Sequence, residues 1–201
     1  MAIEFLRGER VTLRPFERRD LEAAQAWISE EGTRRFLGAV LPKNVEQEHA
    51  WFDELVRGAE HQMVFAICLA GTDEHVGNCG LHGVDWINRA AEFGIVLGEA
   101  AARDKGFGTE AARLVLRYAF EQLNLNRVLL RVYAYNLRAI RCYEKAGYRL
   151  EGRLRQARYW EGRYWDVLLM AVLRAEYFAG RAEADDADAR TERFGMCQDQ
   201  R

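Results

Sequence analysis

The segment from Glu92 to Tyr133 constrains the fold more than any other part of this 201-residue chain. A run with strand character at Glu92–Leu97 comes before a helical pattern, and another at Arg127–Tyr133 comes after it. From Thr109 the apolar residues recur at helical spacing, at Ala112, Val115, Leu116, Ala119 and Leu123. A strand, a helix and a strand in succession predict a βαβ unit, and therefore a sheet that is not purely antiparallel.

The rest of the chain adds shorter strands and helices to this unit. Asp20 is expected to cap a helix that runs to about Glu30, and Gly147 to close the last helix. The other expected helices are 46–58 and 137–145, and the other expected strands are 11–14, 63–69, 75–84, 148–155 and 164–173. Periodicity is lost from about Arg174. We expect one α/β domain over residues 1–176, followed by a mobile acidic tail over 177–201.

Composition and charge exclude several classes of protein. Hydrophobic residues make up 49% of the chain, enough for a sizeable core, and 29 Lys and Arg against 31 Asp and Glu remove the basic excess of a dedicated nucleic-acid binder. The longest apolar run, Val167–Leu173, is too short to span a bilayer, and the N-terminal residues do not resemble a secretory signal. The four cysteines form no Cys-x-x-Cys pair, and the four histidines have no metal-ligand spacing. We expect a cytoplasmic protein with reduced thiols, no metal site, and neither nucleic acid nor membrane as partner.

A short glycine-containing stretch, Arg103–Thr109, separates the first strand of the βαβ unit from its helix. Gly106 and Gly108 permit backbone conformations that other residues resist, so that successive N–H groups can converge at the helix N-terminus. Such a site favours an anion, most often phosphate, and Arg103 and Lys105 add positive charge. Taken alone, the stretch is equally compatible with a strand-to-helix loop that carries a solvated basic pair.

A nucleotide-binding interpretation of the same glycines fits less well. Gly106, Gly108 and Ala111 match the G-x-G-x-x-A dinucleotide fingerprint. In that fingerprint, however, the glycines follow the strand at once and an acidic residue ends the next strand, whereas here a long loop intervenes and the next strand ends without an acid. A nicotinamide enzyme therefore remains only a third option, and no Gly-Lys-Ser or Gly-Lys-Thr sequence supports a Walker A loop.

The arrangement Arg103-x-x-Gly106-x-Gly108 resembles the pyrophosphate loop of the GNAT acetyltransferases, which holds coenzyme A. Further segments match this family in order, over about residues 9–174: Val11–Phe16, typical of the RimJ/RimL-like branch, then Trp86–Gly94, Asn136–Tyr148 and Gly162–Met170. The resemblance implies a single domain with a mixed, mostly antiparallel sheet flanked by helices, whose central strands splay apart at the acyl-CoA site. Asp104 departs from the family pattern, and an acid beside a phosphate loop should point outward.

The resemblance also implies roles for individual residues. Glu92 would act as the base that deprotonates the amine, usually through water, and the backbone N–H of Val96 or Leu97 would bind the acetyl carbonyl. The cofactor would also contact Asp104, Lys105, Phe107 and Thr109 of the loop, and Asn136 would hold the pantetheine arm. The alternative for Glu92 is a surface charge at the end of a strand. The alternative for Tyr143 is a tyrosine that belongs to the core.

Tyr143 is the candidate acid that protonates the leaving thiolate. It lies seven residues after Asn136, nearly two helical turns, so that both residues can face the cofactor. Cys142 points off that face, which makes it a poor covalent nucleophile. The simpler mechanism is therefore direct attack of the amine on acetyl-CoA in a ternary complex.

The acceptor is the least constrained feature. The RimJ/RimL resemblance implies a protein N-terminal amine; the alternatives are a small amine (polyamine, amino acid or aminoglycoside) and a non-catalytic acyl-CoA-binding module. Arg153, Arg155 and Arg158 either attract an acidic acceptor or keep the last hairpin soluble. The loop Gly32–Pro42 could border the amine site. The aromatic residues of that hairpin either border the amine site as well or pack as ordinary cross-strand pairs; they are Tyr159, Trp160, Tyr164 and Trp165. The edge of the same hairpin offers a place where a homodimer could form.

Overall fold

A computed structural model of the chain describes residues 4–38, 41–98, 102 and 104–182. Within that part, eight strands form one sheet in the order β1-β2-β3-β4-β5-β6-β8-β7. The strands are β1 Leu6–Arg7, β2 Val11–Pro15, β3 Met63–Leu69, β4 His75–Asp85, β5 Ala90–Leu97, β6 Arg127–Tyr133, β7 Arg149–Trp160 and β8 Arg163–Leu173. Among their pairings, β5 with β6 is the parallel one and the others are antiparallel, which confirms the mixed, mostly antiparallel sheet.

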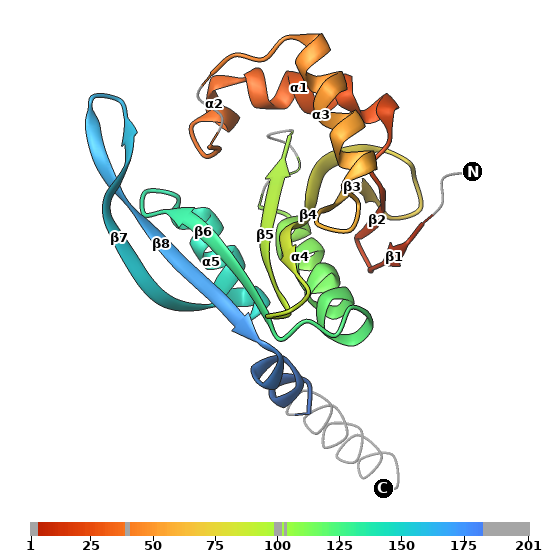
Figure 1. Cartoon of the computed structure of the whole chain (residues 1–201), viewed down its shortest axis with the longest axis vertical. Helices are drawn as coiled ribbons and strands as arrows, with labels where there is room; N and C mark the ends of the chain where they lie inside the picture. The colour runs from red at the N-terminus through yellow and green to blue at the C-terminus, as the bar shows by residue number, and fades with distance from the viewer. Residues whose placement is uncertain (1–3, 39–40, 99–101, 103, 183–201) are drawn as a thin grey trace, which may run out of the picture.

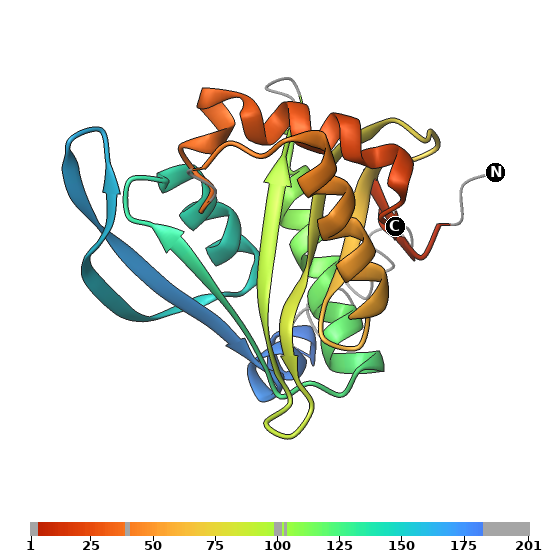
Figure 2. The ribbon, with the colours of Figure 1, turned by 45° about the horizontal axis from the view of Figure 1, so that its top comes forward.

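Helices cover both faces of this sheet (Figure 1 and Figure 2). The helices are η1 Arg18–Asp20, α1 Leu21–Ser29, α2 Glu31–Arg34, α3 Val45–Arg57, α4 Phe107–Arg117, the π-helical turn η3 Tyr118–Gln122 and α5 Leu137–Ala146. The larger hydrophobic core lies between the sheet and α4 with α5, and a smaller core lies between the sheet and α1 with α3. In Figure 2, α4 and α5 lie behind β5 and β6, whereas α1 and α3 lie in front of the sheet.

The sheet opens between its two parallel strands. β5 and β6 pair only from Ala90 opposite Arg127 to Glu92 opposite Leu129. Each strand keeps its other neighbour beyond that point, since β5 pairs with β4 as far as Leu97 and β6 pairs with β8 as far as Tyr133. The two halves of the sheet therefore diverge after Glu92, as Figure 1 shows, and the expected splay of the central strands is confirmed.

Three local expectations differ from the structure. Asp20 precedes α1 but its side chain does not cap that helix; it is buried and accepts hydrogen bonds from Arg14 Nη1 (2.7 Å) and Nη2 (2.8 Å), because a buried guanidinium needs a carboxylate partner. The expected loop 32–42 contains helical residues at α2. Residues 174–182 form a helix, in which the Tyr177 ring packs 5.2 Å from that of Phe120. The limits of the domain and the tail stay a prediction, since residues 183–201 lie outside the described part.

Candidate active site

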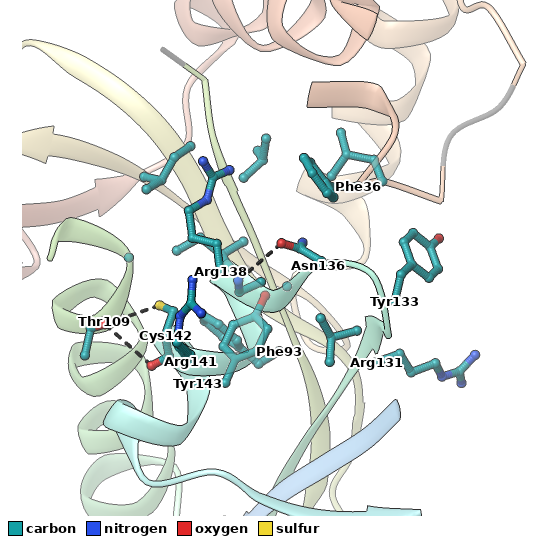
Figure 3. Close-up of a pocket in the computed structure, with 18 of the residues that line it drawn as sticks. Phe36, Phe93, Thr109, Arg131, Tyr133, Asn136, Arg138, Arg141, Cys142 and Tyr143 are labelled. Carbon is teal, nitrogen blue, oxygen red and sulfur yellow. Dashed lines mark hydrogen bonds between the residues drawn. The ribbon is translucent and has the colours of Figure 1, made fainter. Parts of the chain in front are cut away.

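A cleft of about 750 Å³ occupies the opening between β5 and β6. One end is lined by the loop and first turn of α4 together with α5. The other end is lined by α2, the residues that follow it, and β7. Figure 3 shows the residues of α5 between these two ends. The cleft thus runs through the gap in the sheet and connects the side of α4 and α5 with the side of α2 and β7.

The loop before α4 has its conformation set by glycine and by an arginine from the N-terminal strands. Gly106 precedes the first residue of α4 with φ +83°, a conformation in which a side chain is strained. Arg10 Nη1 donates to the carbonyl of Lys105 (3.1 Å) and would lie only 2.6 Å from a Cβ on Gly106. The first N–H groups of a helix have no partner within it, and Gly106, Phe107, Gly108 and Thr109 all line the cleft. This end of the cleft therefore has the backbone arrangement expected of an anion site, and the binding of an anion there stays a prediction.

Gly108 has a different role from the one expected. It is a helical residue of α4, so no left-handed conformation requires a glycine there. A Cβ at Gly108 would lie 3.3 Å from Cys142 Sγ, so the missing side chain allows α4 to approach α5 closely. Thr109 Oγ1 reinforces this contact at 3.3 Å from the same sulfur. Cys142 lines the cleft together with Tyr143, so the expectation that it points away from that face is wrong. Burial raises the pKa of its thiol, however, which disfavours the reactive thiolate.

The positions of the charged loop residues can be compared with the sequence prediction only in part. Asp104 and Lys105 are both exposed, and Asp104 lines the mouth of the cleft with φ +61°. Arg103 lies outside the described residues. Sequence reasoning did not single out three basic side chains of α5 that line the cleft, Arg138, Arg141 and Lys145. Of these, Arg138 reaches toward the other end, where its guanidinium carbon lies 5.9 Å from the ring centre of Phe36. Their spacing of three and four residues places them on one helical face, and that periodicity was the signal in the sequence.

The two faces of β5 separate the candidate catalytic residues. Ala91, Phe93, Ile95 and Leu97 belong to or pack on the core beneath α4 and α5. Because side chains alternate along a strand, Glu92 projects from the opposite face. There Arg131 Nη2 lies 3.5 Å from Glu92 Oε2, and the two side chains are 60% and 37% exposed. Glu92 also lines the cleft, so it is more than an isolated surface charge.

Backbone groups of β5 also face the opening. Gly98 N–H donates to the Val76 carbonyl on the β4 side (3.0 Å). In an antiparallel pair, N–H groups two residues apart point the same way, so Val96 N–H also points to β4. The N–H of Leu97 then points toward the gap, where β6 has diverged. Of the two expected donors to an acetyl carbonyl, Leu97 is the one that faces the cleft.

Tyr143 and Asn136 both line the cleft from α5, as Figure 3 shows. Tyr143 is buried, its ring lies edge-on to Phe93 with centroids 6.3 Å apart, and burial raises the pKa of its hydroxyl. Asn136 precedes α5, and its side-chain oxygen accepts a hydrogen bond from Ala139 N–H (3.2 Å). The carboxamide oxygen is therefore engaged as a helix cap, and the NH₂ group is the donor that remains.

The residues that line the opposite end of the cleft distinguish between the side chains of the last hairpin. Arg158 lines the cleft beside Leu37 and Gly38, whereas Arg153 and Arg155 do not line it. None of the four aromatic residues singled out in the hairpin is among the described lining residues. They pack instead, as in the cross-strand contact of Tyr159 with Tyr164 (5.1 Å between centroids). The packing alternative thus describes these aromatic side chains.

Comparison with known proteins identifies the family. Residues 10–149 match the model of the family described as "Acetyltransferase (GNAT) domain". This chain belongs to the GNAT acetyltransferases. As a GNAT protein it is an N-acetyltransferase that uses acetyl-CoA as its acetyl donor.

Individual GNAT relatives cover nearly the same span. The chain is 31% identical, over 87% of its length and 99% of the relative, to the uncharacterized N-acetyltransferase p20 of Bacillus licheniformis. It is 27% identical to the spermidine N(1)-acetyltransferase of Escherichia coli (strain K12), over 84% of this chain and 89% of that one. The crystal structure of spermidine N-acetyltransferase from Vibrio cholerae in complex with CoA and spermine has a TM-score of 0.77 and 27% identity, covering 85% of this chain and 99% of that chain.

No helix among the described residues has the length and apolar character needed to cross a bilayer.

Proposed function

We propose that this GNAT enzyme acetylates the primary amine of a small molecule by direct attack on acetyl-CoA in a ternary complex. The observation that carries the proposal is that a single cleft passes through the gap in the sheet and has a different lining on each side. The loop before α4 and the basic face of α5 lie at one end, and Glu92 projects from the opposite face of β5. The two substrates can therefore enter from opposite sides and meet between β5 and β6.

The donor side of the cleft fits an acylated carrier with a diphosphate. The first-turn N–H groups of α4 supply donors to phosphate oxygens, and Arg138, Arg141 and Lys145 supply positive charge. The NH₂ group of Asn136 is positioned to hold an amide of the pantetheine arm. The Leu97 N–H, which points into the gap, would stabilise the negative oxygen that develops on the acetyl carbon.

Two side chains move protons in this scheme. An alkylammonium has no lone pair, so the amine must lose a proton before it attacks, and Glu92 accepts that proton directly or through water. The thiolate of coenzyme A then leaves, and Tyr143 donates its hydroxyl proton to the sulfur. A phenol, with a reference pKa near 10, is protonated at neutral pH and can donate to the departing thiolate. Burial raises the pKa of Tyr143 further, which keeps the proton on the hydroxyl until the thiolate develops.

The acceptor end favours a small molecule over a protein N-terminus. Tyr135 donates its hydroxyl proton to the Arg35 carbonyl, and Arg158 Nη2 donates to the Leu37 carbonyl (3.0 Å). These bonds hold the residues that follow α2 against β7 and the connection after β6, which narrows the room that a protein chain would need at that end. The named spermidine acetyltransferases among the relatives also support a small amine. The sequence resemblance to the RimJ/RimL-like branch supports the alternative of a protein N-terminal amine.

Release of free thiol from acetyl-CoA, followed in the presence of an amine library, tests the proposed function. The library contains polyamines, amino acids, aminoglycosides and peptides with free N-termini. We expect thiol release that depends on at least one small amine and exceeds that with any peptide. Preference for a peptide would replace the small-amine acceptor, and acetyl-CoA binding with no amine-dependent release would indicate a non-catalytic binding module.

A further inference from the structure

Arg158 is a buried cation with no anionic partner among the described residues. Its exposed fraction is 9%, yet it forms no ion pair with any described residue. Its Nε atom is buried and has no hydrogen-bond partner among the described residues. A guanidinium has five N–H donors and cannot lose its charge, so burial without a carboxylate is unfavourable.

The contacts of Arg158 are all with neutral groups. Besides the hydrogen bond to the Leu37 carbonyl, its guanidinium carbon lies 4.7 Å from the ring centre of Tyr133 and 5.4 Å from that of Trp160. Cation–π contacts orient the guanidinium but do not neutralise it. Arg14, which is also buried, differs in this respect: its guanidinium donates hydrogen bonds to both Asp20 and Asp73.

A β-bulge accounts for the position of Arg158 at the cleft. The pairing of β7 with β8 shifts between Leu154 and Arg158. Within this bulge Gln156 has φ +53°, and its N–H donates to Asp166 Oδ1 (2.9 Å). Bulges redirect side chains locally, and here Arg158 reaches the cleft, while Arg155 is exposed outside it.

Arg158 lies on the acceptor side of the cleft. Tyr133 and Arg131 project from the face of β6 opposite the core side chains Val128, Leu130 and Val132, which is also the face of Glu92. Arg158 packs on Tyr133 and borders Leu37, away from the α4 loop that fits a diphosphate. Among the described lining residues of this end, Glu92 is the carboxylate, and the cations are Arg131, Arg158 and Arg138, whose guanidinium carbon lies 5.9 Å from the ring centre of Phe36.

We propose that the acceptor is an amino acid or a similar small amine that carries a carboxylate, and that Arg158 binds this carboxylate while the amine reaches Glu92. The inference rests on the proposed function. An arginine edge binds a planar carboxylate through two parallel hydrogen bonds. A polyamine would bring further ammonium groups against Arg131 and Arg158, and this like-charge contact is unfavourable.

Matched acceptor pairs test the proposal in the wild-type enzyme without any substitution. Each pair consists of an amino acid and the amine left after its decarboxylation, for example ornithine and putrescine. O-phosphoethanolamine against ethanolamine distinguishes a carboxylate from a phosphate requirement. We expect kcat/KM to favour the carboxylated member by about 10- to 100-fold, as a charge-assisted hydrogen-bond pair would give. Preference for the decarboxylated members, or for phosphoethanolamine over every amino acid, would overturn the proposal.

Substitution of Arg158 separates recognition from a merely structural role. Arg158→Gln should lower kcat/KM for the carboxylated acceptor by about 10- to 100-fold, chiefly through KM, and change kcat/KM for its decarboxylated partner by less than about 3-fold. Arg155→Gln makes the same chemical change on the exposed part of the hairpin and should leave the preference intact. Equal losses for both acceptors would indicate that Arg158 only supports the fold.

Two further measurements keep the outcomes distinct. The affinity of Arg158→Gln for coenzyme A reports whether the cleft remains folded, and Arg158→Lys, which retains the charge, should retain part of the carboxylate preference. If no amine of either kind releases thiol from acetyl-CoA in the wild-type enzyme, the proposed function fails. If amines react without any preference for a carboxylate, the proposed function stands and only this inference fails.

Discussion

Tyr143 and Glu92 approach the gap in the sheet from opposite faces, and each can be tested separately. Tyr143 is buried among Phe93 and Tyr148, whereas Glu92 is partly exposed beside Arg131. The sequence alone could single out Glu92 and Tyr143 as candidates. It could not show that Arg131 pairs with Glu92 or that Arg158 has no carboxylate partner among the described residues, because these facts depend on which strands become neighbours and where β7 is bulged.

Tyr143→Phe should lower kcat by about 10²- to 10⁴-fold, the usual contribution of a general acid, with little change in the affinity for coenzyme A. Steady-state kinetics and calorimetry measure the two quantities. Tyr148→Phe is the matched control, because its hydroxyl is buried without a partner among the described residues and does not line the cleft. Unchanged turnover in Tyr143→Phe would remove the acid role.

Glu92→Gln should lower kcat/KM by about 100-fold at pH 7. The loss should shrink as the pH rises toward 10, because a growing fraction of the acceptor amine is then already deprotonated. A pH–rate profile of both forms measures this convergence. Parallel profiles, with the same loss at every pH, would assign Glu92 a role in binding rather than in proton transfer.

His82 makes the stability depend on pH. Burial lowers the pKa of His82 below 6.5, although Glu92 opposes the shift. The unfolded chain therefore binds this proton at higher pH than the folded chain. The contribution of His82 to the free energy of unfolding is fully present above about pH 6.5 and is lost as the pH falls toward the pKa of the folded state. The slope is at most about 1.4 kcal/mol per pH unit. Melting temperatures from pH 7.5 to 5 should show a flatter dependence in His82→Gln than in His61→Gln, which replaces an exposed histidine. Equal slopes would contradict this account.

At the scale of elements, the strands and long helices were well predicted because their patterns are local. The expected strands Met63–Leu69 and Arg127–Tyr133 have the observed bounds. The four-residue α2 was missed, since so short a helix has no periodicity. The helix 174–182 was missed because Tyr177 is stabilised by Phe120, a contact with no local signal. Gly108 was misassigned because spacing alone cannot distinguish a turn glycine from one that admits a neighbouring helix.

Gly106→Ala tests the link between the α4 loop and coenzyme A. An alanine at φ +83° is strained and its Cβ would displace Arg10, so we expect about a tenfold weaker Kd for coenzyme A together with a lower melting temperature. Gly71→Ala is the control, since Gly71 has φ +77° with no atom within 4 Å of its Cβ position and does not line the cleft. It should lower the melting temperature alone. Equal Kd values for both variants would show that the loop does not hold the donor.

For the whole molecule, the order of the elements predicted the architecture, and the family resemblance added the splayed sheet. The βαβ unit forces β5 and β6 to be parallel, and the divergence after Glu92 turns the seam between them into a cleft. The charges at the proposed acceptor end include Glu92, Arg131 and Arg158, which come from β5, β6 and β7 and are distant in the sequence. No local pattern relates them, so the acceptor was the part of the function that sequence reasoning could not resolve.

The most direct test of the account is a crystal structure of this enzyme with coenzyme A or an unreactive acetyl-CoA analogue. It should place the diphosphate within hydrogen-bond distance of the N–H groups of residues 106–109, and the acyl end in the gap beside Leu97 and Tyr143. A diphosphate bound elsewhere, with this gap filled by side chains, would contradict the assignment of the two ends of the cleft and the mechanism built on it.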